Sequence, residues 1–202
     1  MKVLVTPSIA EMTVKKSRFL SEAIPVDSAE QAREVWRSQK LKYDNGGHIV
    51  YAFVTGTSGG IMGCSDDGEP AGTAGRPTLE VVKNSGITNF IVTTARWYGG
   101  IKLGTGGLVK AYTEAAQLAV SSVVTRELQL MAHVNFALPY FMLELVKTHL
   151  ESIKFETFNE DYAENIRFSG RLPEQYRESL ETFLRDLSKG SVQLQVSAVR
   201  ME

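Results

Sequence analysis

Residues 96–110 read RWYGGIKLGTGGLVK, a stretch with five glycines and three cations but no carboxylate. The preceding run NFIVTTARW (89–97) is rich in β-branched residues and predicts a strand. The following run LVKAYTEAAQLAVSSV (108–123) has the apolar spacing of a helix. The glycine segment therefore joins the end of a strand to a helix that starts near Gly106, and this unit predicts mixed layers of helices and strands for the first half of the chain.

The start of the predicted helix is suited to an anion, because unpaired N–H groups and the positive end of the helix dipole meet there. Glycines also let a backbone approach a ligand closely. A turn that only permits tight packing is the alternative. The segment lacks the Gly-Lys-Ser/Thr ending of a P-loop and is not placed as a G-x-G-x-x-G dinucleotide fingerprint. Trp97 and Tyr98 would stack on bases or pack at the strand end. We predict phosphate or RNA binding by Arg96, Lys102, Gly104, Thr105, Gly106, Gly107 and Lys110.

A second group of polar residues lies in SDDGEPAGTAGRP (65–77). Its carboxylates offer oxygen ligands of the kind that Mg²⁺ prefers. Asp-Gly and Glu-Pro are also turn dipeptides, so a turn, or a partner for Arg76 or Arg96, is the simpler interpretation, and no metal is predicted. His48 is a candidate general base and Ser17 a candidate nucleophile, but spacing fixes no partner for either. The possible second cluster comprises His48, Asp66, Asp67, Glu69 and Arg76.

Composition excludes several classes of protein. The 202 residues carry a net charge of −1, which excludes a strongly basic nucleic-acid binder. Residues 1–125 hold 13 Lys+Arg against 11 Asp+Glu, a net of +2, so positive charge is local. One cysteine, Cys64, excludes an internal disulfide or a thiolate metal cluster. No apolar run approaches the ~20 residues of a membrane helix, and the N-terminus lacks the pattern of a signal peptide. We expect a cytoplasmic protein without a membrane contact or cofactor.

Glycine content divides the chain. Fifteen of the seventeen glycines lie between Gly46 and Gly107, so we place a domain boundary between residues 1–125 and 126–202. The first part also shows a helix at 27–41, with Asp27 as N-cap and Glu30 in a capping box. Further predicted elements are strands at 19–26 and 47–55 and a helix at 76–86. The second part alternates strand-like and helical patterns at 128–136, 139–152, 154–162, 163–171, 173–190 and 191–200. Their order is β-α-β-β-α-β, the split βαβ of ferredoxin-like domains.

Three segments, KKSRF (15–19), SDDGEPAGTAGRP (65–77) and RWYGGIKLGTGGLVKAY (96–112), together resemble the IMPACT or YigZ family. The likeness runs from about Lys15 to Ala119, and the βαββαβ tail is similar to the bacterial two-domain form. It implies an α+β protein whose first domain has the fold of elongation factor G domain IV, a small-subunit ribosomal protein and the GHMP kinases, with a left-handed βαβ crossover. It also implies a ferredoxin-like second domain similar to elongation factor G domain V.

Domains IV and V of elongation factor G both contact ribosomal RNA. The animal and yeast members of the family resemble regulators of translation initiation that act through a kinase-activating partner. That partner is bound partly by an additional N-terminal domain and is not expected for this chain. Family members commonly have His-Asn where this sequence has His48 and Ile49, so a role that depends on that asparagine is not carried over to Ile49.

The leading hypothesis is a non-enzymatic RNA- or ribosome-binding protein that regulates translation. The alternative is an enzyme acting on a small phosphorylated or nucleotide ligand at the glycine-rich loop, with the acidic cluster holding a metal or taking a proton. A protein-protein adaptor is a third possibility, for which the sequence shows no peptide-binding signature.

Overall fold

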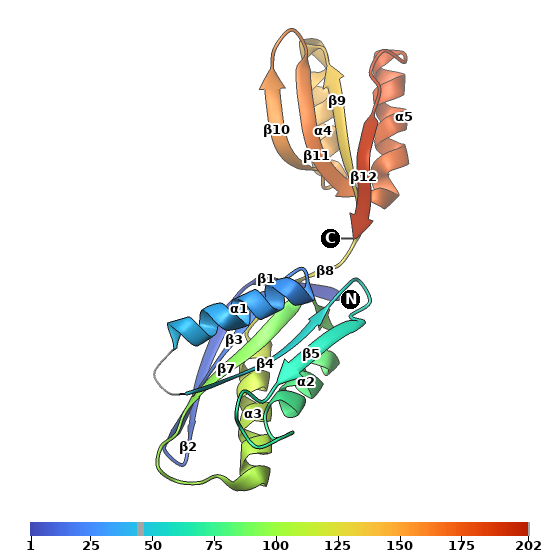
Figure 1. Cartoon of the computed structure of the whole chain (residues 1–202). Coiled ribbons are helices and arrows are strands. Elements are labelled where there is room, and N and C mark those ends of the chain that lie inside the picture. Colours follow the sequence, from blue (N-terminus) through green and yellow to red (C-terminus); the bar gives the residue numbers. More distant parts are fainter. Residues whose placement is uncertain (44–46, 202) are drawn as a thin grey trace. The chain divides into compact units, whose positions relative to one another are not determined.

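The computed structural model describes residues 1–43 and 47–201. The chain divides into two compact units, Met1–Leu128 and Gln129–Glu202 (Figure 1). The boundary predicted after residue 125 falls inside strand β8 (Val124–Glu127). Both units combine helices and strands, as expected for an α+β protein. None of the helices in the described ranges is long and apolar enough to cross a membrane.

The first unit is built around a five-stranded antiparallel sheet, in the order β2 (Ser8–Val14), β3 (Ser17–Pro25), β7 (Phe90–Trp97), β4 (His48–Thr55) and β5 (Ile61–Ser65). The three central strands are those that the sequence predicts, and β7 is buried at seven of its eight residues. The edge strands β2 and β5 had no predicted counterpart, because both are only partly buried. A smaller sheet joins β6 (Ile87–Thr88), β1 (Lys2–Thr6) and β8.

Three helices enclose the larger sheet. Helix α1 (Ala29–Lys42) covers one face, and helices α2 (Gly75–Asn84) and α3 (Gly104–Ser121) cover the other (Figure 1). Phe53 packs beneath α1, whereas its neighbour Ala52 belongs to the core under α2 and α3. Successive side chains of a strand point to opposite faces, so one strand serves both layers. The sheet is therefore the middle layer of three.

The start of α1 corrects the predicted capping box. Ser28 is the N-cap instead of Asp27, and its side chain accepts a hydrogen bond of 3.1 Å from the N–H of Gln31. The side chain of Gln31 accepts a bond of 2.6 Å from the N–H of Asp27. Ser28-x-x-Gln31 is itself a capping-box pattern, and it displaces the pair of Asp27 and Glu30 that begins one residue earlier.

The second unit has the predicted element order. Its strands and helices are β9 (Leu130–Leu138), η1 (Tyr140–Met142), α4 (Leu143–Ser152), β10 (Glu156–Tyr162), β11 (Ile166–Pro173), η2 (Glu174–Tyr176), α5 (Arg177–Ser188) and β12 (Gln195–Met201). The strands form one sheet in the order β10-β11-β9-β12, in which every neighbouring pair is antiparallel. A register shift between Val196 and Ala198 interrupts the last strand, so the predicted alternation does not continue through β12.

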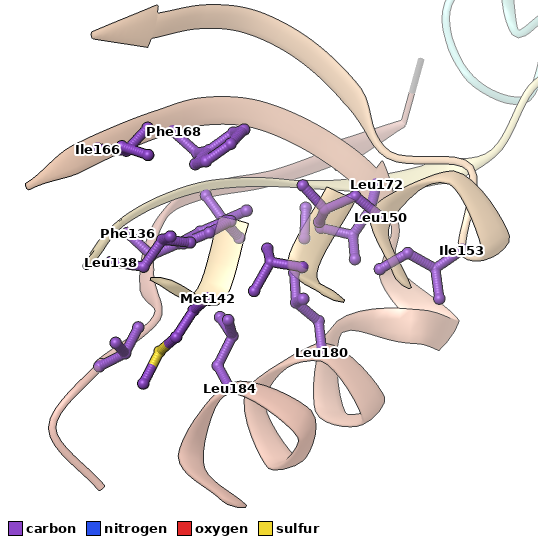
Figure 2. Close-up of a cluster of buried hydrophobic side chains, with 14 residues drawn as sticks. Phe136, Leu138, Met142, Leu150, Ile153, Ile166, Phe168, Leu172, Leu180 and Leu184 are labelled. Atoms are coloured by element: carbon purple, nitrogen blue, oxygen red, sulfur yellow. The ribbon is translucent and has the colours of Figure 1, made fainter. Parts of the chain in front are cut away.

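A hydrophobic core lies between this sheet and its two helices. Phe136 of β9 and Phe168 of β11 stack with ring centroids 5.3 Å apart. Figure 2 shows Leu180 and Leu184 of α5 directed from the helix toward the side chains of the sheet. Fourteen buried residues make up the cluster, and those from β9 and β11 alternate along their strands. The opposite face of the sheet carries the residues that alternate with these, among them His133 and Asn135 of β9.

Candidate functional site

A pocket of about 560 Å³ lies where the end of β7, the start of β4 and the start of α3 meet. We call it the α3 pocket. Six of the predicted site residues line it: His48, Glu69, Arg96, Lys102, Gly104 and Thr105. The other lining residues are Pro70, Tyr98, Leu103 and Leu108. The structure therefore brings together members of both predicted clusters.

The first turn of α3 forms one wall of the α3 pocket. Among residues 1–43 and 47–201 no side chain caps this helix, and its first turn contains no acidic residue. The first N–H groups of a helix have no intrahelical partner, so those of Gly104 and Thr105 are available where these residues line the pocket. The positive end of the helix dipole lies at the same place. This end of α3 therefore favours a negatively charged group.

Glycine occupies different positions of the 96–110 segment for different physical reasons. A Cβ on Gly99 would lie 2.0 Å from the carbonyl oxygen of Lys16, so this glycine permits two chain segments to pack. Gly104 has a φ of +73°, which favours glycine. Gly106 has neither feature, because its φ is not positive and a Cβ there would meet no described atom beyond its own stretch of helix within 4 Å. Packing thus explains Gly99 but leaves open space beside Gly106 at the helix start.

Arg96 is the buried cation of the α3 pocket, at 7% exposure. Its Nη1 donates to Oε1 of Glu69 at 2.7 Å, and Nη2 donates to Oγ of Ser17 at 3.4 Å. Among the described residues, its Nε has no hydrogen-bond partner. Ser17 is fully buried and also accepts a 3.3 Å bond from the N–H of Gly99, so its hydroxyl serves to join β3 to this segment.

Tyr112 of α3 completes the buried network, although the sequence predicted only a helix here and no site role for this residue. Its hydroxyl donates to Oε1 of Glu69 at 2.7 Å. Burial raises the pKa of Tyr112 strongly, and the negative charge of Glu69 raises it further. The available signal was a hydroxyl in a helix stripe otherwise made of alanine and leucine, since a buried tyrosine usually needs a hydrogen-bond partner.

His48 begins β4 directly opposite Arg96 in the register of the sheet. Its Nδ1 lies 2.7 Å from the carbonyl oxygen of Asp67. A carbonyl oxygen only accepts, so Nδ1 carries the proton and Nε2 of the neutral ring is an acceptor. Gly68 packs against this ring, since a Cβ there would lie 3.0 Å from Nδ1. The histidine thus has a fixed tautomer at the edge of the α3 pocket.

The other predicted residues of the acidic cluster are engaged elsewhere. The carboxylate of Asp66 accepts from the N–H groups of Gly72, Ala74 and Gly75 at 2.8, 3.0 and 2.7 Å, and thereby caps α2. Burial works to raise the pKa of Asp66, but these three bonds together outweigh it and lower that pKa. In the described ranges no group of three His, Cys, Asp or Glu side chains is placed to hold a metal ion.

Asp67 and Arg76 are likewise paired outside the pocket. Asp67 accepts from the N–H of Ile49 at 2.8 Å and pairs with Lys40 at 2.5 Å. Arg76 lies 3.6 Å from Glu80 on the exposed side of α2. Neither Asp67 nor Arg76 is part of the pocket lining.

The predicted phosphate-binding residues separate into two groups. Lys102 lines the α3 pocket, whereas Lys110 lies 3.8 Å from Glu114 on the outer side of α3. Gly106, Gly107 and Lys110 do not belong to the lining. Of the two aromatic residues, Tyr98 lines the pocket and is 58% exposed, with Arg96 5.7 Å from its ring centre. Trp97 instead packs edge-on against Tyr43 at 5.8 Å.

Comparisons with known proteins cover both units. Residues 15–120 match the family described as the Impact N-terminal domain. The chain is 33% identical over 183 residues to "IMPACT family member YigZ" of Escherichia coli, covering 90% of each. It is 33% identical over 98 residues to "Protein IMPACT" of Mus musculus, covering 46% of this chain and 30% of that protein. A solved "Crystal structure of an hypothetical protein" superposes with a TM-score of 0.66 and 31% identity, covering 98% of this chain and 97% of that one.

Proposed function

This chain belongs to the IMPACT family, and from this membership we propose that it is a non-enzymatic RNA- or ribosome-binding protein whose α3 pocket holds a backbone phosphate. The observation that carries the proposal is the start of α3, which no described side chain caps and which lines the same pocket as Arg96 and Lys102. A phosphate oxygen accepts from the N–H groups of Gly104 and Thr105 at once. Lys102 adds a full positive charge at the same pocket.

The proposed fold relationships agree with a role in translation. We propose that the two units are the two domains of the bacterial family form, with the first sharing the fold of elongation factor G domain IV and its left-handed crossover. The second is a ferredoxin-like domain similar to domain V, which its sheet order β10-β11-β9-β12 supports. Domains IV and V of elongation factor G both contact ribosomal RNA, so we place the proposed RNA partner in the translation apparatus. In this proposal the protein acts in the cytoplasm as a regulator of translation.

The salt dependence of RNA binding tests this function. Each phosphate contact with a single strand contributes about −0.7 to the slope of log K against log salt concentration. Lys102→Glu removes one such contact and is expected to weaken binding and to make the slope shallower by about 0.7. Lys83→Glu on α2 is the matched control, because it changes net charge equally but lies outside the pocket lining. Absence of RNA or ribosome binding by the full chain even at low salt would remove the proposal.

A second candidate function is an enzyme acting on a small phosphorylated or nucleotide ligand. The size of the α3 pocket, about 560 Å³, is within the range of small-molecule sites, and His48 presents Nε2 as an acceptor there. Thermal unfolding in the presence of nucleotides, with and without Mg²⁺, discriminates between the two functions. A true ligand at about 100 times its Kd stabilises the fold by about 2.7 kcal/mol, and no shift with any nucleotide excludes a nucleotide as the ligand of this site.

A further inference from the structure

The sheet of the second unit has one face that its helices do not use. Both helices pack on the face that carries Phe136 and Phe168. The residues that alternate with these, such as Asn135 of β9 and Ser169 of β11, point to the opposite side, since side chains of a strand change faces at each step. We call this the open face. It is separate from the α3 pocket, which belongs to the first unit.

A polar pocket of about 650 Å³ lies on the open face. We call it the amide pocket, because four of its lining side chains are amides: Asn135, Asn159, Gln193 and Gln195. Within the described part of the chain, none of these four amide groups makes a side-chain hydrogen bond. Each offers both a donor and an acceptor. Ser169 and Ser191 add hydroxyl groups to the same lining.

The charges of the amide pocket argue against a simple anion site. Asp161 and Arg167 both line it, and they lie opposite each other in the register of β10 and β11. One carboxylate and one guanidinium leave no net charge for a phosphate. Amides, hydroxyls and this pair together match the edge of a nucleobase, which presents donors and acceptors side by side.

An aromatic side chain stands beside the amide pocket. Phe158 of β10 is 55% exposed, and its ring lies 5.6 Å from His133 and 5.7 Å from the guanidinium of Arg171. His133 and Arg171 are register partners on the open face. His133 and Asn135 are two residues apart on β9, which corresponds to roughly 7 Å along a strand. A ring for stacking and a set of edge-binding groups are therefore neighbours on one surface.

We propose that the open face binds the bases of single-stranded RNA, one base stacking on Phe158 while the next presents its edge to the amide pocket, an inference that rests on the RNA binding proposed above. Stacking suits every base, because each has a π face, and the amides add hydrogen bonds to the base edge. A double helix has its bases stacked and paired, so it is not a ligand for this surface.

Alanine substitution of Phe158 in the full chain tests the stacking. Loss of one base–aromatic contact is expected to weaken binding of a short single-stranded RNA of randomised sequence by about five-fold or more. The salt slope stays unchanged, because no phosphate contact is lost. Phe141→Ala is the matched control, since Phe141 is 79% exposed and lies in η1 of the same unit. An abasic oligomer with the same backbone binds wild type and Phe158→Ala equally.

Substitution of the amides tests the pocket independently of the ring. Gln195→Ala is expected to weaken the same RNA, whereas Gln175→Ala, an exposed glutamine outside the pocket lining, leaves binding unchanged. RNA containing 5-bromouridine should crosslink on irradiation to the peptide that contains Phe158.

The outcomes separate this inference from the proposed function. If the wild-type chain binds no RNA, the proposed function fails, and the open-face site fails with it. If RNA binds and depends on Lys102, but Phe158→Ala and Gln195→Ala bind like their controls, only the open-face site is overturned. Crosslinks confined to the first unit, or an equal loss of abasic oligomer binding in Phe158→Ala, overturn it as well.

Discussion

At the scale of single residues, Arg96 and Glu69 carry opposite charges into the interior of the first unit, with side chains 8% and 3% exposed. Removing two charges from water costs several kcal/mol per ion, which their attraction offsets only when the geometry is good. The bonds from Arg96 and Tyr112 to one oxygen of Glu69 supply that geometry. The network therefore holds the guanidinium fixed at the wall of the α3 pocket.

Glu69→Gln tests this network by removing one charge while keeping the shape of the side chain. Arg96 would then be a buried charge without its counter-charge, and we expect a loss of unfolding free energy of roughly 3–5 kcal/mol. The measurement is denaturant unfolding followed by fluorescence. Glu80→Gln is the control, because Glu80 pairs with Arg76 on the exposed surface, where such pairs contribute about 0–1 kcal/mol. Equal effects of the two substitutions would contradict a buried, coupled pair.

At the scale of elements, the loop between β5 and α2 depends on Asp66. Its carboxylate accepts from the N–H of Gly72 in the loop, of the N-cap residue Ala74 and of the first helical residue Gly75. Loss of a helix cap typically costs about 0.5–2 kcal/mol, and Asp66→Ala is expected to reach the upper part of that range. Asp66→Asn should retain part of these bonds, since an amide oxygen also accepts. Denaturant unfolding at neutral pH measures both variants, and no loss in Asp66→Ala would contradict this role.

Acid adds a second test of Asp66. The pKa of Asp66 is lower in the folded protein, so its contribution to stability is complete above the unfolded pKa of about 3.9 and is lost as the pH falls through the folded value. Unfolding free energy followed into acid should therefore fall more steeply for wild type than for Asp66→Asn, which has no group to protonate. If unfolding free energy fell equally with pH in both proteins, the three bonds would not be stronger for the charged carboxylate than for its protonated form.

The start of α3 offers a substitution that separates stability from binding. Gly106 lies in open space with no positive φ, so alanine fits there and favours the helix by roughly 0.5–1 kcal/mol. We expect Gly106→Ala to unfold at higher denaturant concentration and to leave RNA binding unchanged, because Gly106 lies outside the lining of the α3 pocket. A variant that is destabilised would contradict the open space, and one that is stabilised but binds RNA more weakly would show that the ligand extends beyond the α3 pocket to Gly106.

Local pattern and tertiary pairing differ in how well the sequence predicts them. The central strands and the βαββαβ order follow from periodicity, which is a local property. The edge strands β2 and β5 escaped prediction, because half-exposed strands do not need a continuous apolar run. The sequence also left open whether the acidic cluster held a metal or paired with an arginine. Glu69 and Arg96 are 27 residues apart in the sequence, and only the tertiary fold brings the loop that carries Glu69 to the end of β7.

At the scale of the whole molecule, charge is too evenly distributed to predict a binding surface. The net charge is −1, and the first 125 residues reach only +2. The proposed RNA binding therefore depends on a few well-placed groups instead of a broad basic field, and we expect the affinity to fall less steeply with salt than that of a basic protein. The amide pocket in the second unit agrees with this picture, since base contacts do not depend on net charge.

The most direct measurement of the central claim is an amide NMR titration of the full chain with a short single-stranded RNA. If the α3 pocket holds a phosphate, the N–H signals of Gly104 and Thr105 shift together and saturate at one RNA concentration. If RNA binds while these two signals stay in place, the phosphate lies elsewhere and the proposed role of the α3 pocket is wrong.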